Sequence, residues 1–446
     1  MAKKSKNSKA WIVAVDMGYG HERAAYALND LAYGGQVLIA NKYPGIPKHE
    51  RDNWKKLRKL YETVSRFKSA PLVGEVVFEV MDRLQQIDLF YPRRDLSRPT
   101  MQVRQTYYLI RKGLGKHLID YCARRPLPLI ATYFQAAFAA EEYDYPGDIY
   151  CVICDADCSR AWAPINPAIS RIKYFAPNGR VAERLKLYGV KPENIYLTGF
   201  PLPKELIGGP GGQVIKRDLS RRLQNLDPKN IFRKKYDRNL ASYLGKGWQK
   251  LDHKHLLTLT FAVGGAGAQK TIGRQIITSL QEKIRQGKIR LNLVTGTHDE
   301  AVPYYQETIR NLKLNRHLGK TINICHAASR TEYFKKFSEL LHTTDILWTK
   351  PSELSFYTGL GLPIIMAPPI GSQEEFNRIW LKTVNGGVTQ NDPRYTNEWL
   401  FDWVNSGGLA RLAWNGFIEA PTHGAYRIES IITGKKVELA NLPMIV

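Results

Sequence analysis

The stretch Val263-Gly-Gly-Ala-Gly-Ala-Gln269 decides the fold class of this chain. It follows an apolar run at 256–262, whose length suits a buried strand, and a helical pattern begins directly after it. Doubly wound α/β domains bind phosphate with such a strand, glycine turn and helix, because the glycines let the backbone approach the ligand and the helix N-terminus offers free N–H groups. A turn that needs positive φ for structural reasons alone gives the same pattern.

A second glycine turn, Gly18-Tyr19-Gly20-His21, follows the apolar run 11–16. An alanine-rich helical pattern comes after it, so this segment also predicts a strand, a turn and a helix. Two such units, each opening a domain-sized segment, predict an α/β protein with two Rossmann-like domains. Neither turn has the complete G-x-G-x-x-G pattern with an acidic ribose ligand, which argues against a NAD-dependent dehydrogenase.

Strand-length apolar runs alternate with helical patterns through both segments, except at 42–125, where amphipathic helices are expected. Further strands are expected at 36–40, 127–134, 149–154, 172–176, 195–198, 256–263, 289–294, 322–325, 346–348 and 363–367. The domains are expected at 1–205, with a basic helical insertion at 42–125, and at 255–418. A basic linker or insertion at 206–254 would join them, and a helical segment at 419–446 would end the chain.

The formal net charge of +24 is concentrated in three segments, 42–68, 93–125 and 213–255, which carry +6, +7 and +8. Each alone is explained equally well as a solvated helix face, but together they indicate an anionic partner, either lipid headgroups or nucleic acid. The five cysteines have no disulfide-like spacing, and we find no secretory signal, so we expect a cytoplasmic location. No apolar run approaches the ~18 residues of a membrane span.

Polar residues follow the predicted strands of the first domain. His21 lies at the start of the helix after the first glycine turn, where open α/β sheets bind ligands. A histidine there can accept a proton from a hydroxyl near neutral pH or bind a phosphate oxygen, and a purely structural histidine gives the same pattern. Asp155 and Asp157 follow the strand at 149–154, where they either cap a turn or assist His21. Cys151 and Cys154 would point to opposite faces of a strand, so no metal site is expected.

The second domain offers polar groups at two helix starts. Ser352 can cap the helix after Pro351, which places Glu353 in its first turn. Gln373 and Asn377 are four residues apart and therefore share a helical face. Amides and carboxylates suit a polyhydroxyl ligand, because sugar hydroxyls both donate and accept hydrogen bonds.

These motifs, in this order, resemble the GT-B glycosyltransferases of the group that contains MurG and the monogalactosyl- and processive glucosyl-diacylglycerol synthases. The resemblance covers most of 11–205 and 256–387. It also rests on Cys154-Asp155 before the strand at 172–176, on Gly199-Phe200-Pro201, on Thr349-Lys350 and on Gly361-Leu362-Pro363. It implies two Rossmann-like domains that face each other across a cleft, with C-terminal helices crossing back to the first domain.

The resemblance also assigns roles by position. It implies that Gly264, Gly265 and Gly267 cradle the diphosphate of a nucleotide sugar, with UDP as the expected nucleotide, and that His21 is the general base or a contact of the diphosphate. Asp155, from its own position, is expected to orient the acceptor hydroxyl or to assist His21. Gln373, Glu374 and Asn377 would hold the donor sugar. The family has a ribose-binding Glu where this chain has Phe356, so Glu353, one helical turn earlier, is its expected substitute. The complete predicted donor-binding set is Gly18, Gly20, Gly264, Gly265, Gly267, Gln269, Glu353, Gln373, Glu374 and Asn377.

The resemblance therefore implies a metal-independent, inverting glycosyltransferase, and no cofactor is expected. Its partners would be a nucleotide sugar, a lipid or lipid-linked acceptor and the anionic inner face of a membrane, where it would be peripheral. One alternative is a sugar-nucleotide epimerase or phosphorylase of the same fold. The other is a non-catalytic protein whose basic segments bind membrane or nucleic acid, and of these partners nucleic acid is the less favoured.

Overall fold

The computed structural model describes residues 9–48, 50–52, 54, 87–250, 255–262, 269–369 and 371–439. The chain divides into two compact units. The first comprises Met1–Pro203, Ile370–Asn377 and Pro421–Val446, and the second comprises Lys204–Pro369 and Arg378–Ala420. Each unit holds one six-stranded sheet. The chain is therefore an α/β protein with two Rossmann-like units, and the predicted fold class is confirmed.

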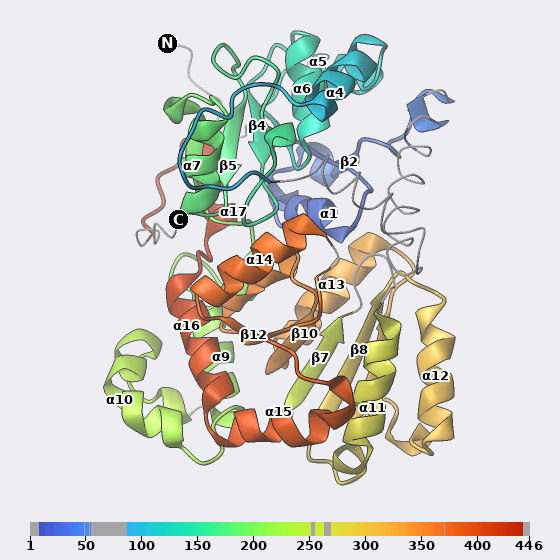
Figure 1. The fold of residues 1–446 in the computed structure, drawn as a ribbon, viewed down its shortest axis with the longest axis vertical. Helices are drawn as coiled ribbons and strands as arrows, with labels where there is room; N and C mark the ends of the chain where they lie inside the picture. The colour runs from blue at the N-terminus through green and yellow to red at the C-terminus, as the bar shows by residue number, and fades with distance from the viewer. Residues whose placement is uncertain are drawn as a thin grey trace. The chain divides into compact units, whose positions relative to one another are not determined.

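The sheet of the first unit has the strand order β2-β1-β3-β4-β5-β6, and all of its strand pairs are parallel. Helices cover the sheet (Figure 1), so central strands such as β1 are buried throughout and consist of continuous apolar residues. The strands are β1 (Trp11–Ala14), β2 (Leu38–Ile39), β3 (Leu129–Ala131), β4 (Ile149–Val152), β5 (Lys173–Ala176) and β6 (Ile195–Leu197). The helices are α1 (Tyr19–Tyr26), α4 (Met101–Arg111), α5 (Lys116–Ala123), α6 (Phe134–Glu142), α7 (Gly179–Leu187) and α17 (Gly424–Thr433).

The second sheet repeats this architecture with the parallel order β12-β11-β10-β7-β8-β9. Its strands are β7 (Thr258–Ala262), β8 (Arg290–Gly296), β9 (Ile322–His326), β10 (Ile346–Thr349), β11 (Ile364–Met366) and β12 (Gly387–Thr389), the last of which was not predicted. Its helices are α8 (Lys204–Ile207), α9 (Gln213–Asn225), α10 (Ile231–Leu244), α11 (Lys270–Arg285), α12 (Ala301–Asn311), α13 (Arg330–Leu341), α15 (Thr396–Asn405) and α16 (Gly408–Glu419). Helix α14 (Ser372–Thr383) contributes to both units.

The basic segment that was expected as a linker or insertion folds as helices α9 and α10 of the second unit. Leu219 and Leu223 of α9 belong to the hydrophobic core of that unit. Arg222 is also buried, and its guanidinium donates hydrogen bonds to the carbonyls of Thr344 at 2.8 Å and Leu360 at 2.9 Å. The segment is therefore part of the folded second unit, and its charge lies on helices with an apolar inner face.

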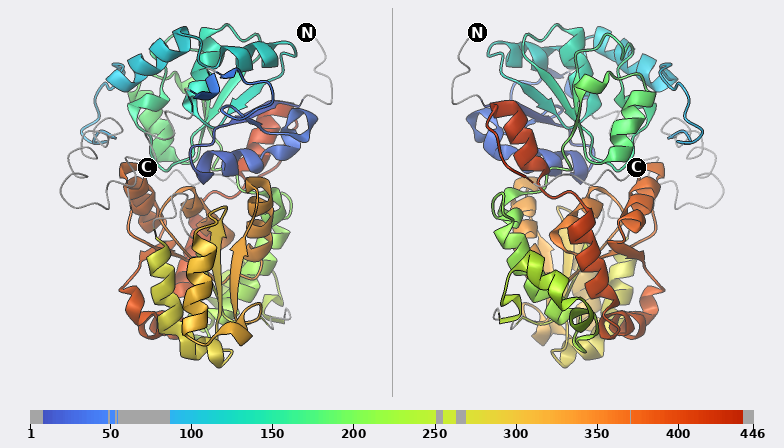
Figure 2. Two further views of the ribbon diagram at one scale, coloured as in Figure 1. Left: turned by 90° about the vertical axis from the view of Figure 1, so that its right-hand side faces the viewer. Right: turned by 90° about the vertical axis from the view of Figure 1, so that its left-hand side faces the viewer.

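The C-terminal helix α17 belongs to the first unit, which agrees with the predicted return of the chain (Figure 2). Pro201 and His423 form an isolated antiparallel bridge just before this helix begins. Gly424 packs so closely that a Cβ atom there would lie 2.5 Å from the carbonyl oxygen of Gly199. Only a glycine fits this contact, so the close packing of the helix start depends on one residue.

The predicted amphipathic region 42–125 is helical at α4 and α5, whereas residues 87–100 contain no helix. Residues 49, 53 and 55–86, which include most of the basic segment 42–68, lie outside the described residues. Among the described residues, no helix is both long enough and apolar enough to cross a membrane.

Candidate functional site

The first sheet reverses its strand order between β1 and β3. Strand β2 follows β1 on one side, and β3 then pairs with the other side of β1. In open parallel sheets the crevice outside the carboxyl ends of two such strands is where ligands bind. His21 lies on α1, which follows β1, and Thr132 follows β3 directly, so the structure brings both residues to this point.

Gly18 begins helix α1 as its N-cap, with φ 119° and ψ 173°. This backbone conformation is accessible essentially only to glycine. A Cβ atom at Gly18 would meet no atom within 4 Å, so the space beside the turn is open. Gly20 lies in the first turn of α1. The first glycine turn is thus required for its conformation and leaves room for a ligand.

His21 is held in one tautomer. Its Nδ1 lies 2.7 Å from the carbonyl oxygen of Thr132, and because a carbonyl can only accept, Nδ1 carries the hydrogen and Nε2 of the neutral ring carries the lone pair. The ring also contacts the aromatic rings of Tyr133, edge to face at 4.9 Å, and Trp162 at 6.0 Å. A histidine oriented by Nδ1 with a basic Nε2 has the arrangement of a general base.

Sequence reasoning missed the polar residues that stabilise this turn. Asp16, buried directly after β1, forms an ion pair with Lys42. Its backbone N–H donates to Oδ1 of Asn41 at 3.0 Å, and Nδ2 of Asn41 donates to the Asp16 carbonyl at 3.3 Å. The available signal was a carboxylate at the end of a buried apolar strand, a position that requires a partner.

Asp157 is a structural residue of the turn after β4. It is 0% exposed and accepts hydrogen bonds from both Nε and a terminal nitrogen of Arg184 at 2.9 Å, from Nε of Arg180 at 2.6 Å and from the backbone N–H of Cys158. Arg184 is also 0% exposed. The negative charge of this carboxylate is therefore compensated inside the protein by the two arginines.

Asp155 is half-buried, and its carboxylate accepts a hydrogen bond at 2.8 Å from Nδ2 of Asn377. Oδ1 of Asn377 accepts from the backbone N–H of Ala156 at 2.7 Å. Asn377 is fully buried, so both ends of its amide bind the turn that carries Asp155. Its role as a sugar contact stays a prediction, whereas its role in positioning Asp155 is visible in the structure.

Buried thiols lie close to this turn. Burial raises the pKa of Cys151 and of Cys158, which keeps both thiols protonated and makes them poor metal ligands. Within the part of the chain that the structure describes, no three histidine, cysteine, aspartate or glutamate side chains gather in a way that could hold a metal ion.

The second sheet has its reversal between β7 and β10. Gly264, Gly265 and Gly267 follow β7, but they lie outside the described residues. Gln269 is the N-cap residue of α11 and is 8% exposed. Its Nε2 donates to the carbonyl of Pro368 at 3.0 Å, while its buried Oε1 has no hydrogen-bond partner among the described residues. An unpaired buried amide oxygen at a helix N-terminus is costly and indicates a position where a ligand donor would bind.

Two cations that the sequence analysis did not single out lie in the first turns of α11. The ammonium group of Lys270 lies 5.3 Å and the guanidinium of Arg274 lies 5.5 Å from the ring centre of Tyr304, on α12. The two residues are four apart and share one helix face. They add positive charge to a helix N-terminus that already favours anions.

The predicted cap at Ser352 is confirmed, because its hydroxyl accepts from the backbone N–H of Leu354 at the start of the 3₁₀ helix Glu353–Leu360. Glu353 is buried in its first turn. Phe356 packs on Trp380 with ring centres 4.8 Å apart, and both side chains are buried, so Phe356 is a packing residue. Gln373 and Glu374 lie half-buried in the first turn of α14, where the Glu374 N–H donates to the carbonyl of Gly371 at 3.1 Å.

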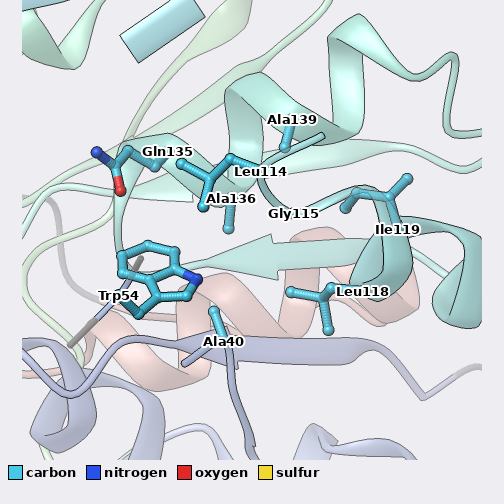
Figure 3. A pocket seen from close by; sticks show the side chains of 9 residues that line it. All are labelled: Ala40, Trp54, Leu114, Gly115, Leu118, Ile119, Gln135, Ala136 and Ala139. Atoms are coloured by element: carbon cyan, nitrogen blue, oxygen red, sulfur yellow. The ribbon is translucent and has the colours of Figure 1, made fainter. Parts of the chain in front are cut away.

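A narrow apolar pocket of about 10 Å³ lies in the first unit beside the start of α6 (Figure 3). Trp54, 5% exposed, and Gln135 line it, and within the described chain Nε1 of the tryptophan and Oε1 of the glutamine are buried without hydrogen-bond partners. The other lining residues are Ala40, Leu114, Gly115, Leu118, Ile119, Ala136 and Ala139.

Residues 238–400 match a protein family described as a domain of unknown function (DUF6938). A search of curated proteins found no match. Similar solved structures include the UDP-GlcNAc 2-epimerase from Neisseria meningitidis bound to UDP-GlcNAc, at 10% identity and a TM-score of 0.46, with 96% of this chain and 100% of that chain covered. MurG from Acinetobacter baumannii is 12% identical with a TM-score of 0.43, and the match covers 74% of this chain and 79% of that chain. A glycosyltransferase from Rickettsia africae is 11% identical with a TM-score of 0.41, and the match covers 96% of this chain and 98% of that chain. The fold assignment rests on the strand orders of this chain itself.

Proposed function

We propose that this protein is a GT-B glycosyltransferase that transfers a sugar from a UDP-sugar to a hydroxyl of a lipid or lipid-linked acceptor, with inversion and without a metal. The observation that carries the proposal is the tautomer of His21, whose Nδ1 donates to the Thr132 carbonyl at the strand reversal. A reaction that begins with removal of a proton from a hydroxyl needs a base in this state.

In this proposal, Nε2 of His21 accepts the proton of the acceptor hydroxyl as the oxygen attacks the anomeric carbon. Asp155, positioned by Asn377, would accept a hydrogen bond from the acceptor or stabilise the charged imidazolium that forms. Gly18 leaves the space that an acceptor needs beside the base. The first unit would thus bind and activate the acceptor.

The second unit would bind the donor. As the bond between sugar and diphosphate breaks, negative charge grows on the leaving diphosphate. The N-terminus of α11, the amide of Gln269 and the cations Lys270 and Arg274 offer positive potential for that charge. Gly264, Gly265 and Gly267 remain the proposed cradle, and Glu353, Gln373 and Glu374 remain the proposed contacts to ribose and sugar.

The outer face of α4 supports a membrane-bound acceptor. Met101 and Tyr108 are 63% and 62% exposed and lie seven residues apart on one face of the helix. The exposed cations Arg104 and Lys112 share this face, where Arg111 pairs with Glu142 at 2.7 Å, while the opposite face packs in the core. Protruding apolar side chains among cations suit the surface of an anionic membrane. We expect the variant Met101→Ser/Tyr108→Ser to bind vesicles that contain phosphatidylglycerol more weakly than the wild type.

The decisive experiment compares wild-type protein with His21→Asn. The Nδ2 of asparagine can still donate to the Thr132 carbonyl, whereas the basic Nε2 is lost. We expect melting temperature and stabilisation by UDP-sugars to be retained and transfer to fall by a factor of about 10²–10⁴. Transfer within a few-fold of wild type would remove His21 from the mechanism. If no nucleotide sugar stabilises the protein, or if a nucleotide sugar is epimerised without an acceptor, transferase activity is not its function.

A further inference from the structure

Helices α11 and α12 lie side by side in the second unit (Figure 1), and a basic recess opens where both end. Its volume is about 570 Å³, and its lining consists of Arg285, Arg310, Lys313, Asn315 and Arg316. Both helices connect a carboxyl end of one parallel strand to the amino end of the next. The recess therefore lies at the amino-terminal edge of the second sheet, away from the carboxyl edge that holds the proposed donor site.

Helix capping explains only part of this charge. Arg285 and Arg310 lie in the last turns of their helices, where cations are favourable. Arg285 pairs with Glu282 and donates to the Leu312 carbonyl at 2.7 Å. Within the described chain, the side chains of Arg310 and Lys313 have no hydrogen-bond or ion-pair partner. Cations gathered in one recess repel each other unless an anion joins them.

Lys313 occupies a position that normally excludes lysine. Helix α12 ends with the N–H of Lys313 donating to the Arg310 carbonyl and the N–H of Leu314 donating to the Ile309 carbonyl, both at 2.9 Å. This double hydrogen bond requires the left-handed conformation at Lys313, which has φ 55°. Glycine or asparagine is the usual residue there. The other described non-glycine residues with positive φ are Asp144, Asn230 and Asn385, so lysine is kept here at a conformational cost.

His317, next to Arg316, is affected by the positive charge around the recess. Arg316 donates from Nε to Nε2 of His317 at 3.4 Å, so that ring nitrogen is an acceptor. Burial and the nearby cations Arg316, Arg285 and Lys320 lower the pKa of His317. The histidine therefore stays neutral near neutral pH and accepts a hydrogen bond from Arg316, which lines the recess.

We infer that this recess is a binding site for a compact, phosphate-dense anion. Guanidinium groups match phosphate oxygens in a bidentate fork, and three of the five lining residues are arginines. The lining contains no aromatic residue on which a base could stack, which disfavours single-stranded nucleic acid. It also contains no apolar side chain that could enter a bilayer, in contrast to the α4 face. The inference does not depend on the proposed transferase activity.

The test is a calorimetric titration of the full chain with tripolyphosphate at constant ionic strength. We expect one saturable site, with affinity about tenfold weaker in Arg310→Ala and in Lys313→Asn, since each removes one charge-assisted contact. Arg238→Ala removes an equally exposed arginine from α10 of the same unit and should leave the affinity unchanged. Asparagine adopts the left-handed conformation more readily than lysine, so Lys313→Asn should keep or raise the melting temperature while it weakens binding.

That combination separates binding from folding, because a purely structural role would move stability and affinity together. The inference is overturned if tripolyphosphate does not saturate, or if both recess variants keep wild-type affinity. It is also overturned if Arg238→Ala loses as much affinity as Arg310→Ala, or if oligothymidine binds more tightly than tripolyphosphate in proportion to its length.

Discussion

Replacement of Asp157 tests how the turn that carries Asp155 is held. The Asp157 carboxylate and the Arg184 guanidinium are both 0% exposed and share two hydrogen bonds of 2.9 Å, and Arg180 adds a third at 2.6 Å. The variant Asp157→Asn keeps the shape but removes the charge, which leaves Arg184 buried without its counter-ion. Breaking such a pair from one side costs about 3–5 kcal/mol.

The ring centre of Phe90 lies 5.0 Å from the Arg184 guanidinium, but this cation–π contact is present before and after the substitution and does not reduce its cost. The net loss should therefore be about 3–5 kcal/mol, a large part of the roughly 5–15 kcal/mol by which a typical domain is stable. The double variant Asp157→Leu/Arg184→Met removes both charges and should cost less than Asp157→Asn alone.

The assay is urea unfolding followed by fluorescence, with hydrogen exchange of β4 and β5 to identify the transition of the first unit. The matched control is Asp148→Asn, which removes the exposed partner of Lys173 at 3.0 Å and should cost less than about 1 kcal/mol. Our reasoning is refuted if Asp157→Asn costs no more than this control, or if the double variant loses as much as Asp157→Asn.

Three further predictions concern single positions. Gly18→Ala should lower the melting temperature and transferase activity together, since its φ of 119° and ψ of 173° cost an alanine about 1–3 kcal/mol, and thermal melts with activity assays measure both. Burial opposes ionisation of Asp218, but hydrogen bonds from His342, at 2.6 Å, and from a neighbouring arginine outweigh it and hold its pKa below the ordinary 3.8. This carboxylate therefore stabilises the fold above pH 3.8 and loses that contribution as the pH falls through its lower folded pKa, so Asp218→Asn should flatten the acid limb of a stability–pH curve. Gly424→Ala would bring a Cβ atom to 2.5 Å from the Gly199 carbonyl, so faster hydrogen exchange in α17 is expected, and unchanged protection would contradict that packing.

The sheets could be predicted because their central strands, such as β1, β3, β4, β7 and β10, are fully buried. A parallel strand covered on both faces is a continuous apolar run, such as Trp11-Ile12-Val13-Ala14, and a glycine turn marks where it ends. Strand β12 escaped prediction because it has three residues and begins with Gly387. The sequence left helices α9 and α10 open as a linker or an insertion, because charged residues dominate both helices and a glycine-rich stretch at 208–212 precedes them.

For the candidate site, the sequence can propose single residues but not the contacts that they make. His21 was proposed from its position after a glycine turn, and its partner is a backbone carbonyl 111 residues away that no local sequence pattern indicates. Asn377 and Asp155 are 222 residues apart, and nothing local links them. A sequence pattern reports the neighbours along a chain, whereas the tautomer of a histidine depends on neighbours in space.

The same limit applies to charge. A sequence counts Arg184, Arg222 and Arg310 as equal contributions to a net charge of +24. In the structure Arg184 neutralises a buried carboxylate and Arg222 donates to backbone carbonyls inside the second unit, so neither presents charge to a partner. Arg310 faces an open recess with no partner in the described chain. An anionic ligand therefore responds to the cations that folding leaves uncompensated, and substitutions of Arg310 and of Arg222 should separate loss of anion binding from loss of stability.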